Sequence, residues 1–266
     1  MTIKSFLLAI LFGLLATSAV AQQKVRTPAE EKELADILVK VQRDAERGHV
    51  RSMVDLGHAY LMGAGGYPQD YEKAATWYLK AAELGDAEAQ NEVGELYEAG
   101  NGFLQDHKKS HYWYEKAAAQ GNAWALYNLG SLYWYGYVVE RDDKKARTYF
   151  ESAIAKGNPS AFWALGAMYF HGHGVSKDIG KAKGYWERGA KLRSNQSAHS
   201  LGKLYRDGVG VERDPVTALM WFRVAAHRNT EVAVADRDAL AKKLSRAQVE
   251  RAKGLEATWV AQLEWK

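Results

Sequence analysis

Two histidines close together in the chain have the spacing of metal ligands. His171 and His173, within the stretch HGHG at residues 171–174, could offer two imidazole nitrogens to a zinc ion. The chain contains no cysteine, and no further histidine or carboxylate stands at ligand spacing beside them. We therefore interpret the stretch as a loop that follows a helix, with His171 available as a contact residue and no metal bound.

A pair of carboxylates is the other candidate for chemistry. Glu92 and Glu95 lie one helical turn apart, and two neighbouring carboxylates can act as general acid and base when their surroundings shift their pKa values. Both fall on a helix face that we expect to be exposed, where nothing would perturb those pKa values. The sequence therefore predicts no catalytic role for this pair.

The known local signatures of enzymes and cofactor sites are missing from the sequence. It contains no G-x-S-x-G, no H-E-x-x-H and no phosphate-binding glycine loop. The glycine-rich stretches GAGGYPQD at 63–70 and GVGVERD at 208–214 recur as connectors between helices, and neither follows a strand. We expect a protein that is not an enzyme and holds no cofactor.

A repeat of 36 residues organises most of the chain. The pattern LGxLYxxGxxVxxDxxKAxxWYxKAAxxG occurs five times, and its first glycine falls at 57, 94, 130, 166 and 202. The single extra residue of the first interval lies between Gly63 and Asp70, which marks this segment as a loop. Fixed periods of this size are typical of solenoids, in which stacked units share one continuous core.

Each repeat predicts two helices. In the first repeat one helix covers about 50–62 and ends at Gly63, since helix ends favour a residue that tolerates positive φ. The second helix begins at an aspartate, a strong N-cap, found at 70, 106, 142, 178 and 214. The mid-helix glycine lowers helix propensity, so its recurrence predicts a close helix crossing that has no room for a side chain. Aromatic pairs of the second helices are expected to fill the seams between units.

These features resemble the Sel1-like repeat, a relative of the tetratricopeptide repeat. The resemblance implies an all-α fold, a right-handed α/α solenoid, and a role as adaptor or regulator through protein contacts. We divide the chain into residues 1–21 as a signal peptide, 22–48 as an N-terminal capping half-repeat, five repeats at 49–85, 86–121, 122–157, 158–193 and 194–229, and 230–266 as C-terminal capping helices. Capping-box spacings at 27–30 and 245–248 begin two of the end helices.

The N-terminus reads as an export signal. Lys4 precedes an apolar run from Phe6 to Ala16, and Ala19-Val20-Ala21 provides a cleavage site before Gln22. An uncleaved membrane anchor is the alternative, although the apolar run is short for a membrane span. Because there is no cysteine, neither a lipid anchor nor a disulfide can form. We expect the periplasm, or secretion as the alternative, with no membrane insertion after cleavage.

The charge pattern does not indicate a nucleic-acid partner. The chain has 36 Lys and Arg against 32 Asp and Glu, a net charge of +4, with both signs interspersed. Export argues against such a partner as well.

The expected partner is another protein, and the residues that vary between repeats predict where it binds. Positions −6, −3, +1 and +4 from the repeated glycine share one face of the first helix. In solenoids of this kind that helix lines the concave side. The predicted contact residues are acidic in repeat 2, aromatic in repeats 3 and 4, and basic in repeat 5: Glu92, Glu95, Glu98, Trp124, Tyr127, Trp134, Trp163, Phe170, His171, His199, Lys203 and Arg206.

Three functions compete at this stage. The first is a non-enzymatic adaptor or inhibitor, such as an immunity protein against an effector or a regulator of envelope signalling. The second is a binder of peptidoglycan or another cell-wall component, because aromatic platforms also stack on sugar rings. An enzyme is the third, and it lacks an assembled site. A structural reading remains open beside all three, in which the aromatic side chains pack between repeats and bind nothing.

Overall fold

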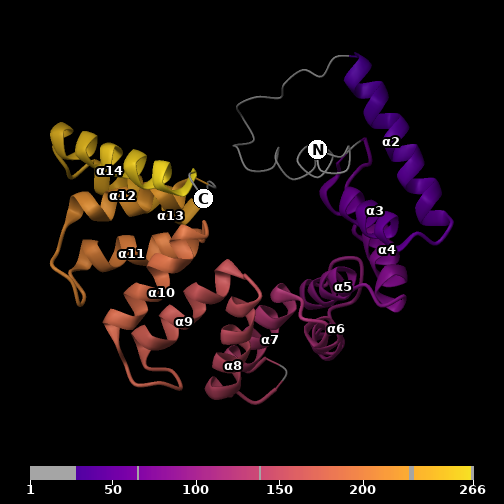
Figure 1. Ribbon diagram of the computed structural model, residues 1–266, viewed down its shortest axis with the longest axis horizontal. Helices are drawn as coiled ribbons and strands as arrows, with labels where there is room; N and C mark the ends of the chain where they lie inside the picture. Colours follow the sequence, from indigo (N-terminus) through magenta and orange to yellow (C-terminus); the bar gives the residue numbers. More distant parts are fainter. Residues whose placement is uncertain (1–27, 65, 138, 228–230, 265–266) are drawn as a thin grey trace. The chain divides into compact units, whose positions relative to one another are not determined.

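A computed structural model describes residues 28–64, 66–137, 139–227 and 231–264 of the chain (Figure 1). The predicted signal peptide, residues 1–21, lies outside them. Every regular element among the described residues is an α-helix. The helices are α2 Pro28–Glu46, α3 Val50–Met62, α4 Tyr71–Glu83, α5 Ala87–Ala99, α6 His107–Ala119, α7 Ala123–Tyr135, α8 Asp143–Ala155, α9 Pro159–His171, α10 Ile179–Lys191, α11 Asn195–Asp207, α12 Pro215–Ala226, α13 Glu231–Ala241 and α14 Arg246–Glu264.

The helices form two compact units that divide at Lys156 and Gly157. The first unit, within residues 28–156, holds α2 to α8, and the second, within 157–264, holds α9 to α14. In both units a first and a second helix of one repeat pack together, as the pairs α3 with α4, α5 with α6, α9 with α10 and α11 with α12 show. The repeat therefore folds as the predicted helix pair.

The predicted helix ends are confirmed. Each of the five aspartates that precede a second helix accepts a hydrogen bond from a backbone N–H in the first turn, and the Asp70 carboxylate, for example, accepts from Lys73 N at 2.9 Å. The first helices end at glycines with left-handed backbone, at 63, 100, 136, 172 and 208. Glycine adopts this conformation without steric cost, so the chain reverses at a defined residue.

The second helix α10 ends without a glycine, and this gives a stability prediction. Arg193 follows α10 with φ at 62°, whereas repeats 1 to 3 have Gly85, Gly121 and Gly157 in this place. We expect Arg193→Gly to raise the free energy of unfolding by about 0.5–1 kcal/mol. Glycine adopts the left-handed backbone conformation of this position without the steric strain that a residue with a Cβ atom has there. Urea denaturation measures the change. Leu192→Gly is the control: its φ is −93°, so it should only lose stability. A less stable Arg193→Gly variant would contradict this account.

The repeated mid-helix glycine makes room for an aromatic ring of the same repeat. An alanine Cβ at Gly94 would lie 2.5 Å from Cε1 of Tyr114, and one at Gly130 would lie 2.6 Å from Cε1 of Phe150. The same contact joins Gly57 with Tyr78, Gly166 with Trp186 and Gly202 with Phe222. The predicted close crossing is therefore confirmed. Its cause is the ring of the second helix, which inserts beneath the first helix.

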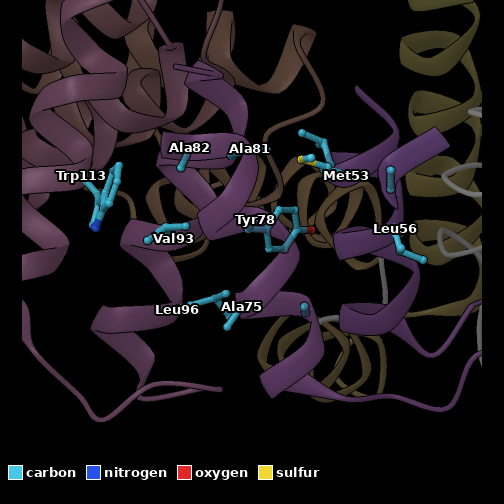
Figure 2. Packing of buried hydrophobic residues seen from close by; sticks show 13 residues of the cluster. Met53, Leu56, Ala75, Tyr78, Ala81, Ala82, Val93, Leu96 and Trp113 are labelled. Carbon is cyan, nitrogen blue, oxygen red and sulfur yellow. The ribbon is translucent and has the colours of Figure 1, made fainter. Parts of the chain in front are cut away.

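Aromatic side chains of the second helices join the core across repeats in the first unit. Tyr78 of repeat 1 and Trp113 of repeat 2 belong to one buried cluster, which also holds Ala81, Ala82 and Val93 (Figure 2). Tyr78 in addition lies beneath Gly57 of its own repeat, because that glycine leaves space for the ring.

The last repeat is covered by the two terminal helices. Both α13 and α14 pack against α12, and the ring of Trp259 meets that of Trp221 edge-on at 4.7 Å. The buried Glu256 carboxylate of α14 accepts from Arg223 and lies 2.6 Å from His227 Nε2.

The capping-box geometry predicted at the start of α14 is present. Ser245 N donates to Gln248 Oε1 at 2.9 Å, and Gln248 N donates back to Ser245 Oγ at 3.3 Å. The first residue of the other predicted box, at 27–30, lies outside the described residues. Within the part of the chain that the structure describes, no helix is both long and apolar enough to cross a membrane.

Candidate protein-binding face

The first helices of consecutive repeats are joined by side-chain hydrogen bonds in the first unit. Arg51 Nη1 of α3 donates to Glu88 Oε2 of α5 at 2.6 Å, and Asn128 Nδ2 of α7 donates to Asn91 Oδ1 of α5 at 3.1 Å. Arg51 and Glu88 occupy the same position of their repeats, whereas Asn128 lies one position beyond the equivalent of Asn91. We call this surface the first-helix face; it comprises Arg51, Asp55, His58, Glu88, Asn91, Glu92, Glu95, Glu98, Trp124, Tyr127, Asn128 and Tyr135.

The α5 part of this face is acidic and partly buried. Burial is the main cause that raises the pKa of Glu92 to about 8, and the neighbouring carboxylates of Glu95 and Glu88 add to it. Burial also raises the pKa of Glu95, although hydrogen bonds from Asn91 and Asn128 oppose the shift. The expectation of ordinary pKa values for this pair was wrong, although Glu95 is exposed as expected and Glu92 is half-buried.

The raised pKa of Glu92 predicts how stability depends on pH. In the unfolded chain this carboxyl titrates near 4.5, so between 4.5 and 8 the folded state binds more protons. The free energy of unfolding contributed by Glu92 therefore falls as the pH rises through this window. We expect Glu92→Gln to be more stable than the wild type at pH 8 and equally stable at pH 4.5, as measured by urea denaturation.

Glu88→Gln is the control for that experiment. The Glu88 carboxylate accepts from Arg51, so its removal should not stabilise the chain at pH 8. An equal difference between Glu92→Gln and the wild type at both pH values would show that burial of this carboxyl does not raise its pKa.

The α7 part of the face carries exposed aromatic area. The Trp124 side chain is 49% exposed, and its ring meets that of Tyr127 edge-on at 6.4 Å. Tyr127 is half-buried, and its ring lies 5.7 Å from that of Phe150. Burial is the main cause that raises the pKa of the Tyr127 phenol, and the nearby Tyr135 adds to the shift. Trp124 therefore offers the larger free surface of the two predicted contact residues.

Trp134, in contrast, is buried. Only 8% of its surface is exposed, and its ring packs edge-on against Phe150 at 5.8 Å. The prediction of an accessible Trp134 was wrong because position +4 of the first helix lies over the aromatic ring of the second helix. The same placement brings Glu98 to Tyr114, whose hydroxyl donates to Glu98 Oε2 at 2.7 Å. A column that varies in residue type can therefore still be partly buried.

Two exposed tyrosines were missed by the sequence reasoning. Tyr135 and Tyr137 are 52% and 64% exposed, and their rings stack at 5.4 Å. Tyr135 occupies position +5, which is Met62, Ala99, His171 and Asp207 in the other repeats. That variation was the available signal. Trp124 and Tyr135 are eleven residues apart, three helical turns, so they project from the same side of α7.

In the second unit the predicted aromatic residues are only partly accessible. Trp163 is half-buried, and its carbonyl oxygen accepts from Trp186 Nε1 at 3.1 Å. Phe170 lies against the Trp186 ring at 5.6 Å. His171 is exposed and stacks with His173 at 5.3 Å; burial and then the His173 charge lower its pKa. Among the described residues, no group of three or more histidines, aspartates and glutamates is placed to hold a metal ion.

The predicted basic end of the face is largely neutralised. His199 Nε2 lies 2.7 Å from Asp236 Oδ2, and Arg206 pairs with Asp207 at 2.7 Å and Asp236 at 3.4 Å. Asp236 belongs to α13, a capping helix outside the repeats, so the repeat pattern could not reveal it. Lys203 is exposed. A basic contact surface stays a prediction, with Lys203 as its exposed member.

Stacked helix pairs with glycine–ring contacts define a helical-repeat scaffold. Proteins of this class bind other proteins, here by way of the first-helix face. Residues 50–86, 87–122, 125–158, 159–194 and 195–229 each match the Sel1 repeat. The chain therefore belongs to the Sel1 repeat family, whose members are in general scaffolds for protein contacts.

Several solved structures share this fold. A Sel1 repeat protein from Oxalobacter formigenes is 27% identical, with 85% of this chain and 94% of that one covered and a TM-score of 0.69. A sel1 repeat protein from Klebsiella pneumoniae is 22% identical over 77% and 99%, with a TM-score of 0.52. An immunity protein from Pseudomonas aeruginosa is 22% identical over 87% and 81%, with a TM-score of 0.50. No curated protein matches the chain.

Proposed function

We propose that this protein is a non-enzymatic binding protein that holds a segment of another protein on the first-helix face of its first unit. The main support is the exposure of Trp124 and Tyr135, each of which is about half exposed on the same side of α7. The carboxylates of α5 lie on the neighbouring first helix. Exposed aromatic rings beside charged groups have the composition of an interface centre with a polar rim. The charged groups then fix the orientation of the partner.

An adaptor or inhibitor role fits this face better than catalysis. Glu95 is held by Asn91 and Asn128, and Glu98 by Tyr114, so these carboxylates already have structural partners. An immunity function against an effector is one version of the proposal, and regulation of envelope signalling is the other. The fold shared with immunity proteins of Pseudomonas aeruginosa supports the first version.

The periplasm is the proposed location, with secretion as the alternative. The support is the N-terminal sequence, where a basic residue, an apolar run and Ala19-Val20-Ala21 have the order of a cleaved leader. The partner would then be an exported protein, or a protein delivered into that compartment by another cell. Fractionation of intact cells tests the location directly.

Truncation of Trp124 is the test of the binding face. A photo-crosslinking residue at Asn128, in cells that express the full chain, captures the partner, and mass spectrometry identifies it. With the purified partner we expect Trp124→Ala to weaken binding by about 2 kcal/mol, roughly 30-fold, because large aromatic side chains dominate such interfaces. Titration calorimetry measures the affinity.

Tyr112→Ala is the matched control, since Tyr112 is 49% exposed as well but lies on α6, a second helix. It should bind normally. Unchanged affinity of Trp124→Ala, or an equal loss in both variants, would refute the assignment of this face.

A cell-wall ligand is the second candidate, favoured by the stacked and exposed rings of Tyr135 and Tyr137. Sugar rings stack on such platforms. Retention of the full chain on purified peptidoglycan, lost in Tyr135→Ala and Tyr137→Ala and without any captured protein, would favour this reading over the first.

A further inference from the structure

The hydroxyl of Tyr78 is buried beneath the first-helix face without a hydrogen-bond partner among the described residues. Its ring extends from α4 and passes under α3, where an alanine Cβ at Gly57 would lie 2.7 Å from Cε1. Figure 2 shows the oxygen on the side of Met53 and Leu56 of α3. Buried hydroxyls nearly always have a partner, because an unmatched one has lost its water without compensation.

The next repeat shows what this hydroxyl lacks. Tyr114 takes the same place beneath Gly94, and its hydroxyl donates to Glu98, four residues after that glycine. The residue four positions after Gly57 is Leu61, which cannot accept a hydrogen bond. The tyrosine of repeat 1 therefore keeps a polar group for which the repeat itself supplies no acceptor.

The charges of several carboxylates act on this hydroxyl. Burial is the first cause that raises the pKa of the Tyr78 phenol, and the carboxylates of Glu92, Glu88, Glu95 and Asp55 add to the shift. Arg51 is the nearby cation, and it is already engaged by Asp55 at 3.0 Å and by Glu88 at 2.6 Å. The negative charge at α5 is thus larger than the charge that Arg51 brings to it.

We propose that a lysine or arginine side chain of the protein partner binds between α3 and α5, against the Glu92 carboxylate and with the Tyr78 hydroxyl as a further acceptor. This inference rests on the proposed function and specifies the chemistry of its partner. An ammonium or guanidinium group carries several donors and a positive charge, which are the two things that the cluster lacks. The exposed Trp124 on α7 would meet the apolar residues beside that cation.

The cost of this cluster to the fold supports a functional role. Glu92 is held in a setting that disfavours its charge, and only a hydrogen bond from Asn91 opposes this. Groups that lower the stability of the fold, with no compensating contact, are typical of functional sites. A bound cation favours the ionised carboxylate, so binding releases the Glu92 proton and becomes tighter as the pH rises from 6 to 8.

Other titratable and charged groups around Glu92 will contribute to that pH dependence. The pKa of His58 is lowered, first by burial, so this residue is neutral near pH 7 and does not act as the missing cation. The groups that face the cluster are Arg51, Asp55 and His58 of α3, Tyr78 of α4, Glu88, Glu95 and Glu98 of α5, and Tyr114 of α6.

The test uses a small cation in place of the partner. N-acetyl-arginine methylamide is titrated into the full chain at pH 7.5, with the citrulline analogue as the uncharged control, while NMR follows the labelled glutamate carboxyl carbons. We expect saturable shifts of Glu92 with the arginine probe only, at least tenfold weaker binding in Glu92→Gln, and weaker binding by severalfold in Tyr78→Phe. Equal binding of citrulline, no saturation, or full binding in Glu92→Gln would overturn the proposal.

Failure of this inference can be told apart from failure of the proposed function. With the captured protein partner, Glu92→Gln should lose at least tenfold in affinity while it remains folded, and the loss should shrink at pH 6. If Trp124→Ala abolishes partner binding but Glu92→Gln does not change it, the face is correct and the cation site is wrong. If neither variant changes partner binding, the face itself is wrong.

Discussion

Replacing Gly166 with alanine is expected to lower the free energy of unfolding by about 1–3 kcal/mol. The new Cβ would lie 2.2 Å from Nε1 of Trp186, so the indole must move and its hydrogen bond to the Trp163 carbonyl is lost. Overpacking costs about 1–3 kcal/mol and the hydrogen bond about 1 kcal/mol, against roughly 1 kcal/mol gained in helix propensity. Urea denaturation followed by tryptophan fluorescence and circular dichroism measures the sum.

The same repeat supplies the matched control. Gly184 lies within α10, and an added Cβ there would meet nothing within 4 Å. Gly184→Ala should therefore raise stability, by up to about 1 kcal/mol, through helix propensity alone. Two identical substitutions eighteen residues apart should thus act with opposite sign. A Gly166→Ala variant that is as stable as Gly184→Ala would mean that the ring does not need the glycine.

The second large effect is expected at Gly102, in the connector of repeat 2. Its φ is +72°, and an added Cβ would lie 2.1 Å from the carbonyl oxygen of Tyr71 at the start of α4. Gly102→Ala should lower the free energy of unfolding by about 3 kcal/mol or more, because left-handed strain adds to a clash with backbone that cannot rotate away. The contact joins two repeats, so the variant should also increase amide hydrogen exchange in α4 and α5.

Gly85→Ala separates the two causes. Gly85 also has a left-handed backbone, with φ at +95°, but nothing lies within 4 Å of an added Cβ. This variant should lose only the strain term of about 1 kcal/mol. Equal losses in both variants would show that the Tyr71 carbonyl does not limit the connector.

The sequence predicted the fold well because local rules set its main features. Helix ends could be placed from capping aspartates and from glycines with positive φ, and the five-fold recurrence removed chance matches. The recurring mid-helix glycine also predicted a close contact between the two helices of a repeat. These signals belong to the chain itself, or to a helix pair of one repeat, and need no knowledge of how the units assemble.

The candidate site could be predicted only in part, since side-chain accessibility depends on tertiary contacts. Trp134 shares its column with a glutamate and an arginine, yet the Phe150 ring beneath it makes the tryptophan an interior residue. Glu92 looked exposed by helical periodicity, while α5 is flanked by its neighbours. Asp236, which contacts His199, comes from a helix outside the repeats. Each error came from a side chain on another helix.

The glycine–ring contact is closed inside every repeat, and this has a consequence for how such chains change in size. Adding or deleting one whole repeat leaves every glycine–ring contact intact, because none of these contacts joins two repeats. Length can then vary in steps of 36 residues while the interior stays as it was, and each step brings a fresh set of outward side chains. Reach and recognition can in this way be altered separately from stability.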